Sequence, residues 1–263
     1  MKEQRSNSIN NFYNCLCDLY TSDKSDSLFD FNGIMLPKPM NREEKIEFFQ
    51  EFLDMLAPKI VKDKTFCNIV TIEGPYELGE VQVKTNDVVI DCGANMGLFS
   101  AIASNKGATV YAFEPGEFII ENYLSKTASI NPNIEICKFA LSNEERLLYF
   151  SQNVNKPASS RILNTSSLNS ERVVTVQATT IDNFVQERNI PQVDFIKADI
   201  EGAERYMLMG ARQVLKEYAP KISICTYHLP DDPKVLRELI LDANPNYIIE
   251  ERFEKMYAYV KVR

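Results

Sequence analysis

The sequence feature that most constrains the fold is the stretch 87–115, which reads DVVIDCGANMGLFSAIASNKGATVYAFEP. The apolar run 88–90 does not alternate with polar residues, which is typical of a strand covered on both faces of a parallel sheet. Residues 97–106 then carry apolar side chains at helical spacing, and residues 109–113 predict a second strand. The stretch therefore predicts a β-α-β unit with a glycine turn before its helix.

A glycine turn that leads into a helix brings backbone N–H groups close to an anionic ligand. The dinucleotide fingerprint G-x-G-x-x-G, aligned on Gly93, would need glycines where Asn95 and Leu98 stand. An acidic residue followed by G-x-G-x-G fits better, because Asp91, Gly93 and Gly97 match and only Asn95 departs. This pattern favours S-adenosylmethionine over NAD, with S-adenosylhomocysteine as the product. The turn residues predicted to bind this cofactor are Asp91, Gly93, Ala94, Asn95, Met96 and Gly97.

A second acidic residue, Glu114, ends the next predicted strand. Its two carboxylate oxygens suit the two vicinal hydroxyls of a ribose. Ligands of open α/β sheets bind beyond the carboxyl ends of the strands, so other residues at strand ends are candidates as well. The residues predicted to complete the cofactor site are Tyr76, Pro115, Ala140, Leu141, Ser142 and Asp199.

The alternation of strands and helices continues along the chain, which indicates an α/β fold. Helices are expected at 116–130, from Thr180 through Val185, and as one continuous helix after Asp199. Strands are expected at 134–139, 193–198 and 221–227, with a turn at 140–142. Two further, outer strands are expected at 147–150 and 173–178. The last two runs, 247–249 and 256–262, predict an antiparallel pair at one edge of the sheet.

The length of 263 residues suits one α/β domain with an N-terminal extension. Residues 1–70 are expected to form a helical extension or cap, with helices at 8–20 and 43–56 and a turn or short hairpin within 29–39. Residues 71–263 are expected to form the cofactor-binding domain. The N-terminal helices are candidates for a contact in a homo-oligomer.

Two residues at strand ends are candidates for chemistry. His228, the one histidine of the chain, follows an apolar strand, and imidazole is well suited to remove the proton of an acceptor hydroxyl near neutral pH. Asp199 is expected to cap the helix that begins with Ile200, to face a transferred methyl group, or to do both, since the two roles are compatible. The polar segment 151–170 predicts a loop over the ligand edge. The residues predicted to contact substrate are Ser159, Ser160, Arg161 and Glu201.

Five motifs follow one another along the chain: VVIDCGANMGLFS, YAFEP, ALSN, VTVQATTIDNF and VDFIKADIEGAE. In this order they resemble FkbM-type S-adenosylmethionine-dependent methyltransferases over about residues 71–227. The resemblance implies a class I methyltransferase fold, Rossmann-like, with a mostly parallel seven-stranded sheet and helices on both faces. It implies that residues 91–97, Glu114 and 140–142 hold the cofactor, and that a hydroxyl of a sugar or natural product is methylated. It fixes neither the acceptor nor the role of His228.

Two other functions stay open. In a metal-assisted O-methyltransferase, Asp199, Asp231 and Asp232 would hold Mg²⁺, although Pro233 after Asp232 favours a helix cap, so no metal ligand is predicted. A protein that binds the cofactor without catalysis is the other alternative. The formal net charge of −8 argues against a nucleic-acid partner, and a small molecule or saccharide with a hydroxyl is the expected acceptor.

The chain contains no run of about 18 apolar residues, and its polar start lacks the apolar core of a signal peptide. We therefore expect no membrane span and a cytoplasmic location.

Overall fold

The computed structural model describes residues 28–31, 34–37, 73–152, 160–163 and 172–261. The helices expected at 8–20 and 43–56, and Ser159, lie outside these residues. Strands β1 (Leu28–Phe31) and β2 (Ile34–Pro37) form an antiparallel hairpin, which confirms the one expected within 29–39. Leu36 is buried in the core cluster that contains α4 (Leu98–Asn105), so this hairpin packs on the domain.

The main sheet has seven strands, as expected from the resemblance. Their order is β12 (Ile248–Arg252), β13 (Lys255–Tyr259), β11 (Lys221–Cys225), β10 (Phe195–Ala198), β3 (Val88–Cys92), β4 (Thr109–Phe113) and β5 (Ile134–Cys137). The pairs from β11 to β5 are parallel, whereas β13 runs antiparallel to both of its neighbours. The antiparallel pair predicted at the C-terminal edge is confirmed.

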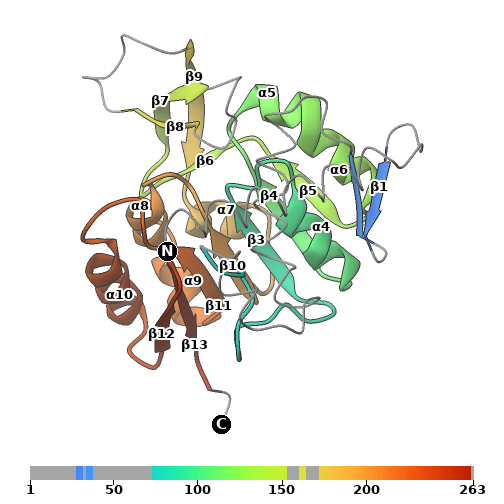
Figure 1. Ribbon diagram of the computed structural model, residues 1–263. Coiled ribbons are helices and arrows are strands. Elements are labelled where there is room, and N and C mark those ends of the chain that lie inside the picture. Colours follow the sequence, from blue (N-terminus) through green and yellow to red (C-terminus); the bar gives the residue numbers. More distant parts are fainter. Residues whose placement is uncertain (1–27, 32–33, 38–72, 153–159, 164–171, 262–263) are drawn as a thin grey trace, which may run out of the picture.

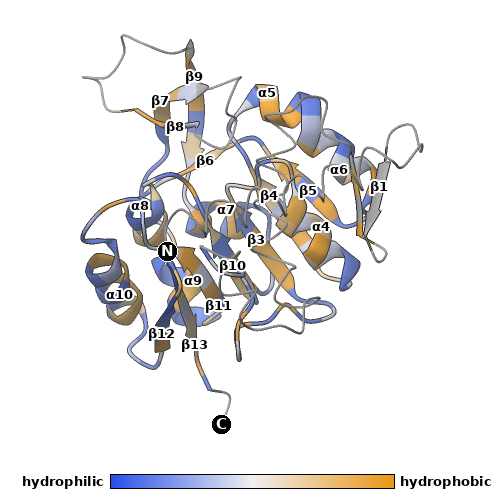
Figure 2. Ribbon diagram, in the orientation of Figure 1, coloured by the Kyte–Doolittle hydropathy of each residue, from blue (hydrophilic) through white to orange (hydrophobic). Residues whose placement is uncertain are grey.

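Successive residues of the central strands point to opposite faces of the sheet, and each face has its own helices. Val89 packs in a core cluster with residues of α4, while the next residue, Ile90, packs with residues of the other helical layer. Figure 1 shows α4, α5 and α6 apart from α8, α9 and α10. Figure 2 shows β3 and α4 mostly in orange, whereas α10 alternates between orange and blue, as expected for a helix with one buried face. The helices not yet bounded are α5 (Glu117–Ile119), the π-helical turn η1 (Ile120–Leu124), α6 (Ser125–Ile130), α7 (Ile181–Glu187), α8 (Glu204–Met209), α9 (Arg212–Glu217) and α10 (Asp232–Ala243).

A second, four-stranded sheet stands beside the main one and corrects three expectations. Its order is β6 (Ala140–Leu141), β9 (Arg172–Thr179), β7 (Arg146–Gln152) and β8 (Arg161–Ile162). Residues 140–141 are a short strand instead of a turn, β7 and β9 do not extend the main sheet, and part of the expected polar loop is strand β8. The reason is a separate apolar cluster, which contains Ala140, Phe150, Val176 and Ala178.

The single helix expected after Asp199 is two helices, α8 and α9, which meet at Gly210. A Cβ atom on Gly210 would lie 2.1 Å from the carbonyl oxygen of Ser142, so the chain passes too close there for a longer side chain. Asp182 then accepts hydrogen bonds from the backbone N–H groups of Gln213 and Val214 and starts α9. Helix α8 begins at Glu204, so Asp199 is not its cap, whereas Thr180 caps α7 as predicted.

Within the described part of the chain, the structure contains no helix that is both long and apolar enough to cross a membrane.

Replacement of Gly210 by alanine tests the close contact between α8 and the β6 segment. The added methyl group must displace the backbone of Ser142, and overpacking of this kind costs about 1–3 kcal/mol. We expect the free energy of unfolding in urea to fall by that amount. Met209→Ala, at an exposed neighbouring position, is the control and should change it by less than about 0.5 kcal/mol. Equal stability of both variants would contradict the contact.

Candidate functional site

A pocket opens at the carboxyl edge of the main sheet, where β3, β4 and β10 end. Gly93, Glu114 and Asp199 line it, and each directly follows the last residue of one of these strands. The neighbouring register brings these three strand ends together, because Cys92 pairs with both Phe113 and Ala198. The predicted location of the site at this edge agrees with the general position of ligands in open α/β sheets.

The glycine turn is shaped by contact with the end of β10. Gly93 has a φ of +78°, and a Cβ atom there would lie 2.0 Å from the carbonyl oxygen of Asp199. Asn95 has a φ of +49°, a left-handed conformation that asparagine tolerates better than most residues. The departure from glycine at the middle of the motif therefore keeps the backbone conformation, while its side chain lines the pocket.

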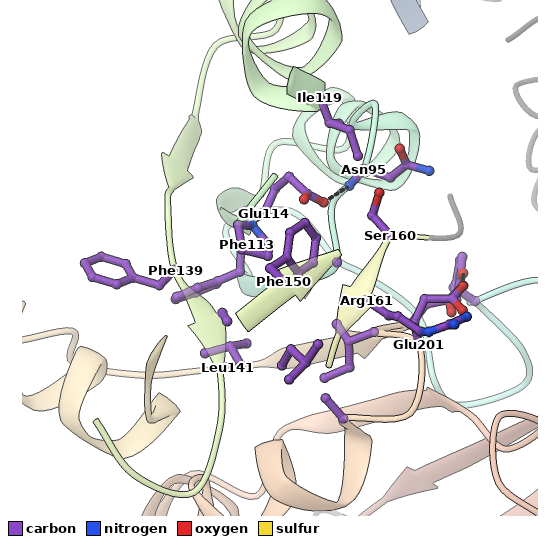
Figure 3. Close-up of a pocket in the computed structure, with 18 of the residues that line it drawn as sticks. Asn95, Phe113, Glu114, Ile119, Phe139, Leu141, Phe150, Ser160, Arg161 and Glu201 are labelled. Carbon is purple, nitrogen blue, oxygen red and sulfur yellow. Dashed lines mark hydrogen bonds between the residues drawn. The ribbon is translucent and has the colours of Figure 1, made fainter. Parts of the chain in front are cut away.

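Glu114 is a buried carboxylate at the pocket wall. Its Oε1 accepts a hydrogen bond from Gly116 N at 2.7 Å, and its Oε2 accepts one from Asn95 N at 3.2 Å (Figure 3). Burial raises the pKa of Glu114 to about 7, against the opposing effect of these two N–H groups. Each oxygen keeps a further lone pair for a ligand. The main-chain bonds fix the carboxylate in one orientation before any ligand arrives.

An apolar group of side chains surrounds Glu114. It consists of Phe113, Ile119, Phe139, Leu141, Phe150 and Ile162. Figure 3 shows several of these rings and branched side chains on the side of the pocket nearest Glu114. Phe150 and Ile162 are paired across β7 and β8, so the second sheet supplies one wall. An apolar slot with one fixed carboxylate suits a flat, partly polar ligand such as a nucleoside.

Below the glycine turn, Lys197 supports the backbone from the middle of β10. Its Nζ donates to the carbonyl oxygen of Gly93 at 2.6 Å and lies 3.1 Å from Asp91 Oδ1. Asp91 also accepts a hydrogen bond from Ser100 at 2.6 Å. Both charged side chains are almost fully buried, and Asp91 does not line the pocket. Asp91, the acidic residue of the motif, thus stabilises the glycine turn from below.

The other end of the pocket is polar and centres on Asp199. Tyr76 donates a hydrogen bond to Asp199 Oδ2 at 2.5 Å, and Tyr227 lies 3.5 Å from Oδ1. Burial acts to raise the pKa of Asp199, but Lys197, Lys255, the Tyr76 hydroxyl and His228 outweigh it and lower that pKa. Asp199 is therefore an anion at neutral pH.

His228 lies behind Asp199, among three carboxylates. Its Nδ1 is 2.9 Å from Glu204 Oε1, and its Nε2 is 3.5 Å from Asp199 Oδ1 and 3.7 Å from Glu201 Oε1. Burial lowers the pKa of His228, but Glu201, Glu204 and Asp199 outweigh it and raise the pKa to about 10. A ring that holds a proton at neutral pH cannot accept another, and His228 does not line the pocket. Its position therefore does not support the predicted role as base.

The turn that carries Glu201 is held by Glu204. The Glu204 carboxylate accepts hydrogen bonds from Ile200 N at 2.8 Å and Gly202 N at 3.0 Å. Glu201 between them has a φ of +55°, a conformation that costs free energy for a residue other than glycine. The sequence DIEGAE therefore forms a clamped turn that presents Glu201 to the pocket.

The structure brings most predicted site residues to this pocket. Those that line it are Tyr76, Gly93, Asn95, Glu114, Pro115, Ala140, Leu141, Ser160, Arg161, Asp199 and Glu201. Those that do not are Asp91, Ala94, Met96, Gly97, Ser142 and His228, and Ser159 lies outside the described residues. The structure shows where these residues lie, and their roles in binding the cofactor and the substrate stay predictions.

Several residues in the pocket and beneath it were missed. Lys197, a charge within the apolar run VDFIKA, is a signal for a buried partner that sequence reasoning could have used. Lys255 lines the pocket, and its Nζ lies 4.5 Å from the centroid of the Tyr76 ring. Glu73, Phe150 and Tyr227 also line the pocket. Nothing in their local sequence marks these four residues, since only the pairing of distant strands brings them here.

The acidic set considered for Mg²⁺ does not assemble. Asp231 and Asp232 both contact Arg205, at 2.9 Å and 2.5 Å, and neither lines the pocket with Asp199. Asp232 Oδ2 also accepts a hydrogen bond from Leu229 N at 2.8 Å. These two residues open helix α10, as Pro233 suggested.

Comparisons with known proteins find methyltransferases. A family model described as the methyltransferase FkbM domain matches residues 91–260. The hexuronic acid methyltransferase AglP of Haloferax volcanii is 25% identical over 162 residues, which are 62% of this chain and 64% of that protein. The crystal structure of a methyltransferase FkbM from Methylobacillus flagellatus KT is similar with a TM-score of 0.52 and 18% identity, covering 82% of this chain and 59% of that one. The chain thus spans less than two thirds of the length of either relative.

A double-mutant cycle tests the support beneath the turn. Lys197→Met leaves the buried Asp91 carboxylate without its cation, which should lower the free energy of unfolding by about 3–5 kcal/mol. Adding Asp91→Asn removes the uncompensated charge and should restore a large part of that loss. Urea unfolding measures Lys197→Met, Asp91→Asn alone and the double variant, with the exposed Lys234→Met as control. If the second substitution only added to the loss, the two residues would not be coupled.

Proposed function

This chain belongs to the FkbM methyltransferase family, and on that premise we propose that it is an S-adenosylmethionine-dependent O-methyltransferase that acts on a hydroxyl of a sugar, glycan or related metabolite. The observation that carries the proposal is the division of one pocket into two ends. An apolar end contains the fixed carboxylate of Glu114, and a polar end contains Asp199 and Glu201. We place the catalytic domain at residues 71–263.

The apolar end fits the nucleoside of the cofactor. Glu114 presents its remaining lone pairs to the ribose hydroxyls, and Pro115, Phe139 and Leu141 flank the adenine. The backbone at Gly93 has no side chain that would block the approach of the methionine part. When bound, S-adenosylmethionine supplies a methyl group on a positively charged sulfur.

The polar end suits a saccharide, whose many hydroxyls need several donors and acceptors. Arg161 begins β8 of the second sheet and Ser160 directly precedes it (Figure 3). Asp199 and Glu201 follow β10. Arg161 adds a positive charge that would attract an acidic sugar. The relative from Haloferax volcanii is a hexuronic acid methyltransferase, which supports sugars with a carboxylate as the first acceptors to examine.

Asp199 orients the acceptor hydroxyl for in-line attack on the methyl group. Because the attacking oxygen becomes positively charged as the new bond forms, its proton turns strongly acidic, and a carboxylate is then a sufficient acceptor. Tyr76 fixes one oxygen of Asp199, and His228 lies behind the other. His228 is thus a positioning residue, in place of the base expected from the sequence.

The acceptor can be identified directly. We expect incubation with methyl-labelled S-adenosylmethionine and a panel of neutral sugars, uronic acids and sugar nucleotides to give a labelled product, with the uronic acids preferred. Asp199→Asn should lower turnover by about 10²–10⁴-fold while cofactor affinity changes little. Asp231→Asn, an exposed carboxylate outside the pocket, is the matched control. Tight cofactor binding with no labelled product from any acceptor would favour a binding protein instead.

The affinity for the cofactor should depend on pH through Glu114. Its pKa is about 7 in the free chain, so about a tenth of the molecules carry the anion at pH 6 and about nine tenths at pH 8. Because the anion accepts the ribose hydroxyls, affinity should fall about tenfold as the pH drops from 8 to 6. Isothermal titration calorimetry checks this, and Glu114→Gln should bind weakly with little pH dependence. An unchanged pH profile in that variant would remove Glu114 from the cofactor site.

A further inference from the structure

We propose that His228, Asp199 and Glu201 bind one divalent metal ion at the polar end of the pocket. The imidazole Nε2 lies 3.5 Å from Asp199 Oδ1 and 3.7 Å from Glu201 Oε1. Both carboxylates line the pocket, so an ion held here would face it. This set shares only Asp199 with the acidic set that the sequence suggested for Mg²⁺.

The spacing of these atoms is the first argument. Hydrogen bonds from N–H to oxygen span about 2.7–3.2 Å, so both distances are too long for one. Two ligands that share an ion at bonds of about 2.1 Å stand roughly 3.0–3.4 Å apart. The Glu201 side chain is 33% exposed, so its carboxylate can turn toward a shared ion.

The state of the imidazole is the second, independent argument. His228 has a side chain that is only 7% exposed, and its Nε2 makes no hydrogen bond in the described part of the chain. A buried polar atom without a partner is costly, and native structures rarely leave one. Here Nε2 faces two carboxylates, and an ion bound there would release to solvent the proton that the ring otherwise carries, because a metal-bound imidazole nitrogen is deprotonated.

Glu204 completes the arrangement from the far side of the ring. It lies 2.9 Å from Nδ1, and its own oxygens are held by Ile200 N and Gly202 N. Metal-binding histidines usually place their second ring nitrogen against such a carboxylate, which orients the ring. Ligand atoms of Asp199, Glu204 and His228 lie within 4.8 Å of one another. Because Glu204 already accepts two main-chain N–H groups, we assign it to positioning and assign Glu201 to the ion.

The chemical types of the three proposed ligands limit which metal ions can bind. One imidazole with two carboxylates suits a divalent first-row transition metal such as Mn²⁺ or Zn²⁺. Three protein ligands leave coordination positions for water or for two neighbouring oxygens of a saccharide. That use of the ion rests on the proposed function, whereas the binding of the ion does not.

Metal binding can be measured without turnover. The chain, stripped with EDTA, is titrated with Mn²⁺ while electron paramagnetic resonance reports the free ion. We expect saturation at one ion per chain, and at least about tenfold weaker binding in both Glu201→Gln and His228→Gln. Asp231→Asn, a nearby carboxylate paired with Arg205, should bind as the wild type does. Thermal unfolding and cofactor binding establish that each variant is folded.

The outcomes separate this inference from the proposed reaction. Absence of saturable Mn²⁺ binding by the folded wild-type chain would overturn the metal site, as would equal weakening in Asp231→Asn and Glu201→Gln. Full transfer of labelled methyl in EDTA by a chain that binds no ion would leave the proposed function standing. Binding of one ion without transfer to any sugar would support the metal site and count against the reaction.

Discussion

The close approach of two strand ends determines the rest of the site. At Gly93 the backbone passes so near the carbonyl oxygen of Asp199 that no side chain fits, and Asp199 N donates to Cys92 O at 3.1 Å. Lys197 secures this contact from below, since its ammonium group holds both the Gly93 carbonyl oxygen and the Asp91 carboxylate. A change at either strand end must therefore move the other.

Asp199 joins the two ends of the pocket for the same reason. The main chain of Asp199 contacts the glycine turn and helps to shape it. Its side chain accepts a hydrogen bond from the Tyr76 hydroxyl and faces the polar end of the pocket. The methyl donor and the acceptor of the proposed reaction would thus be aligned by one residue, and in-line transfer depends on such alignment. In the proposed reaction, this carboxylate would set the geometry of transfer and add little to the affinity for the nucleoside.

The sequence allowed the central β-α-β unit and the C-terminal hairpin to be predicted because their signals are local. The predicted strand 109–113 agrees with β4, and the residues that follow β3, β4 and β10 lie together as expected. The second sheet was not predicted, since the pairing of Ala140 with Ala178 joins segments that no periodicity connects. The surroundings of His228 were missed for a similar reason. A strand-end position suggested a base, but the three carboxylates around the ring depend on a turn clamped by Glu204.

The balance of charge distinguishes the two sides of Asp199. On one side, Lys197 and Lys255 lie 5.0 Å and 4.5 Å from the centroid of the Tyr76 ring, and this ring carries the hydroxyl that bonds to Asp199. On the other side, Glu201 and Glu204 join Asp199 around one imidazole, and Arg161 lines the same end of the pocket. Partly buried carboxylates are costly unless cations pair with them, and in the proposed metal site the ion would add to the positive charge of these side chains. A metal ion supplies more positive charge than a proton, and unlike a proton it can also hold an acceptor oxygen.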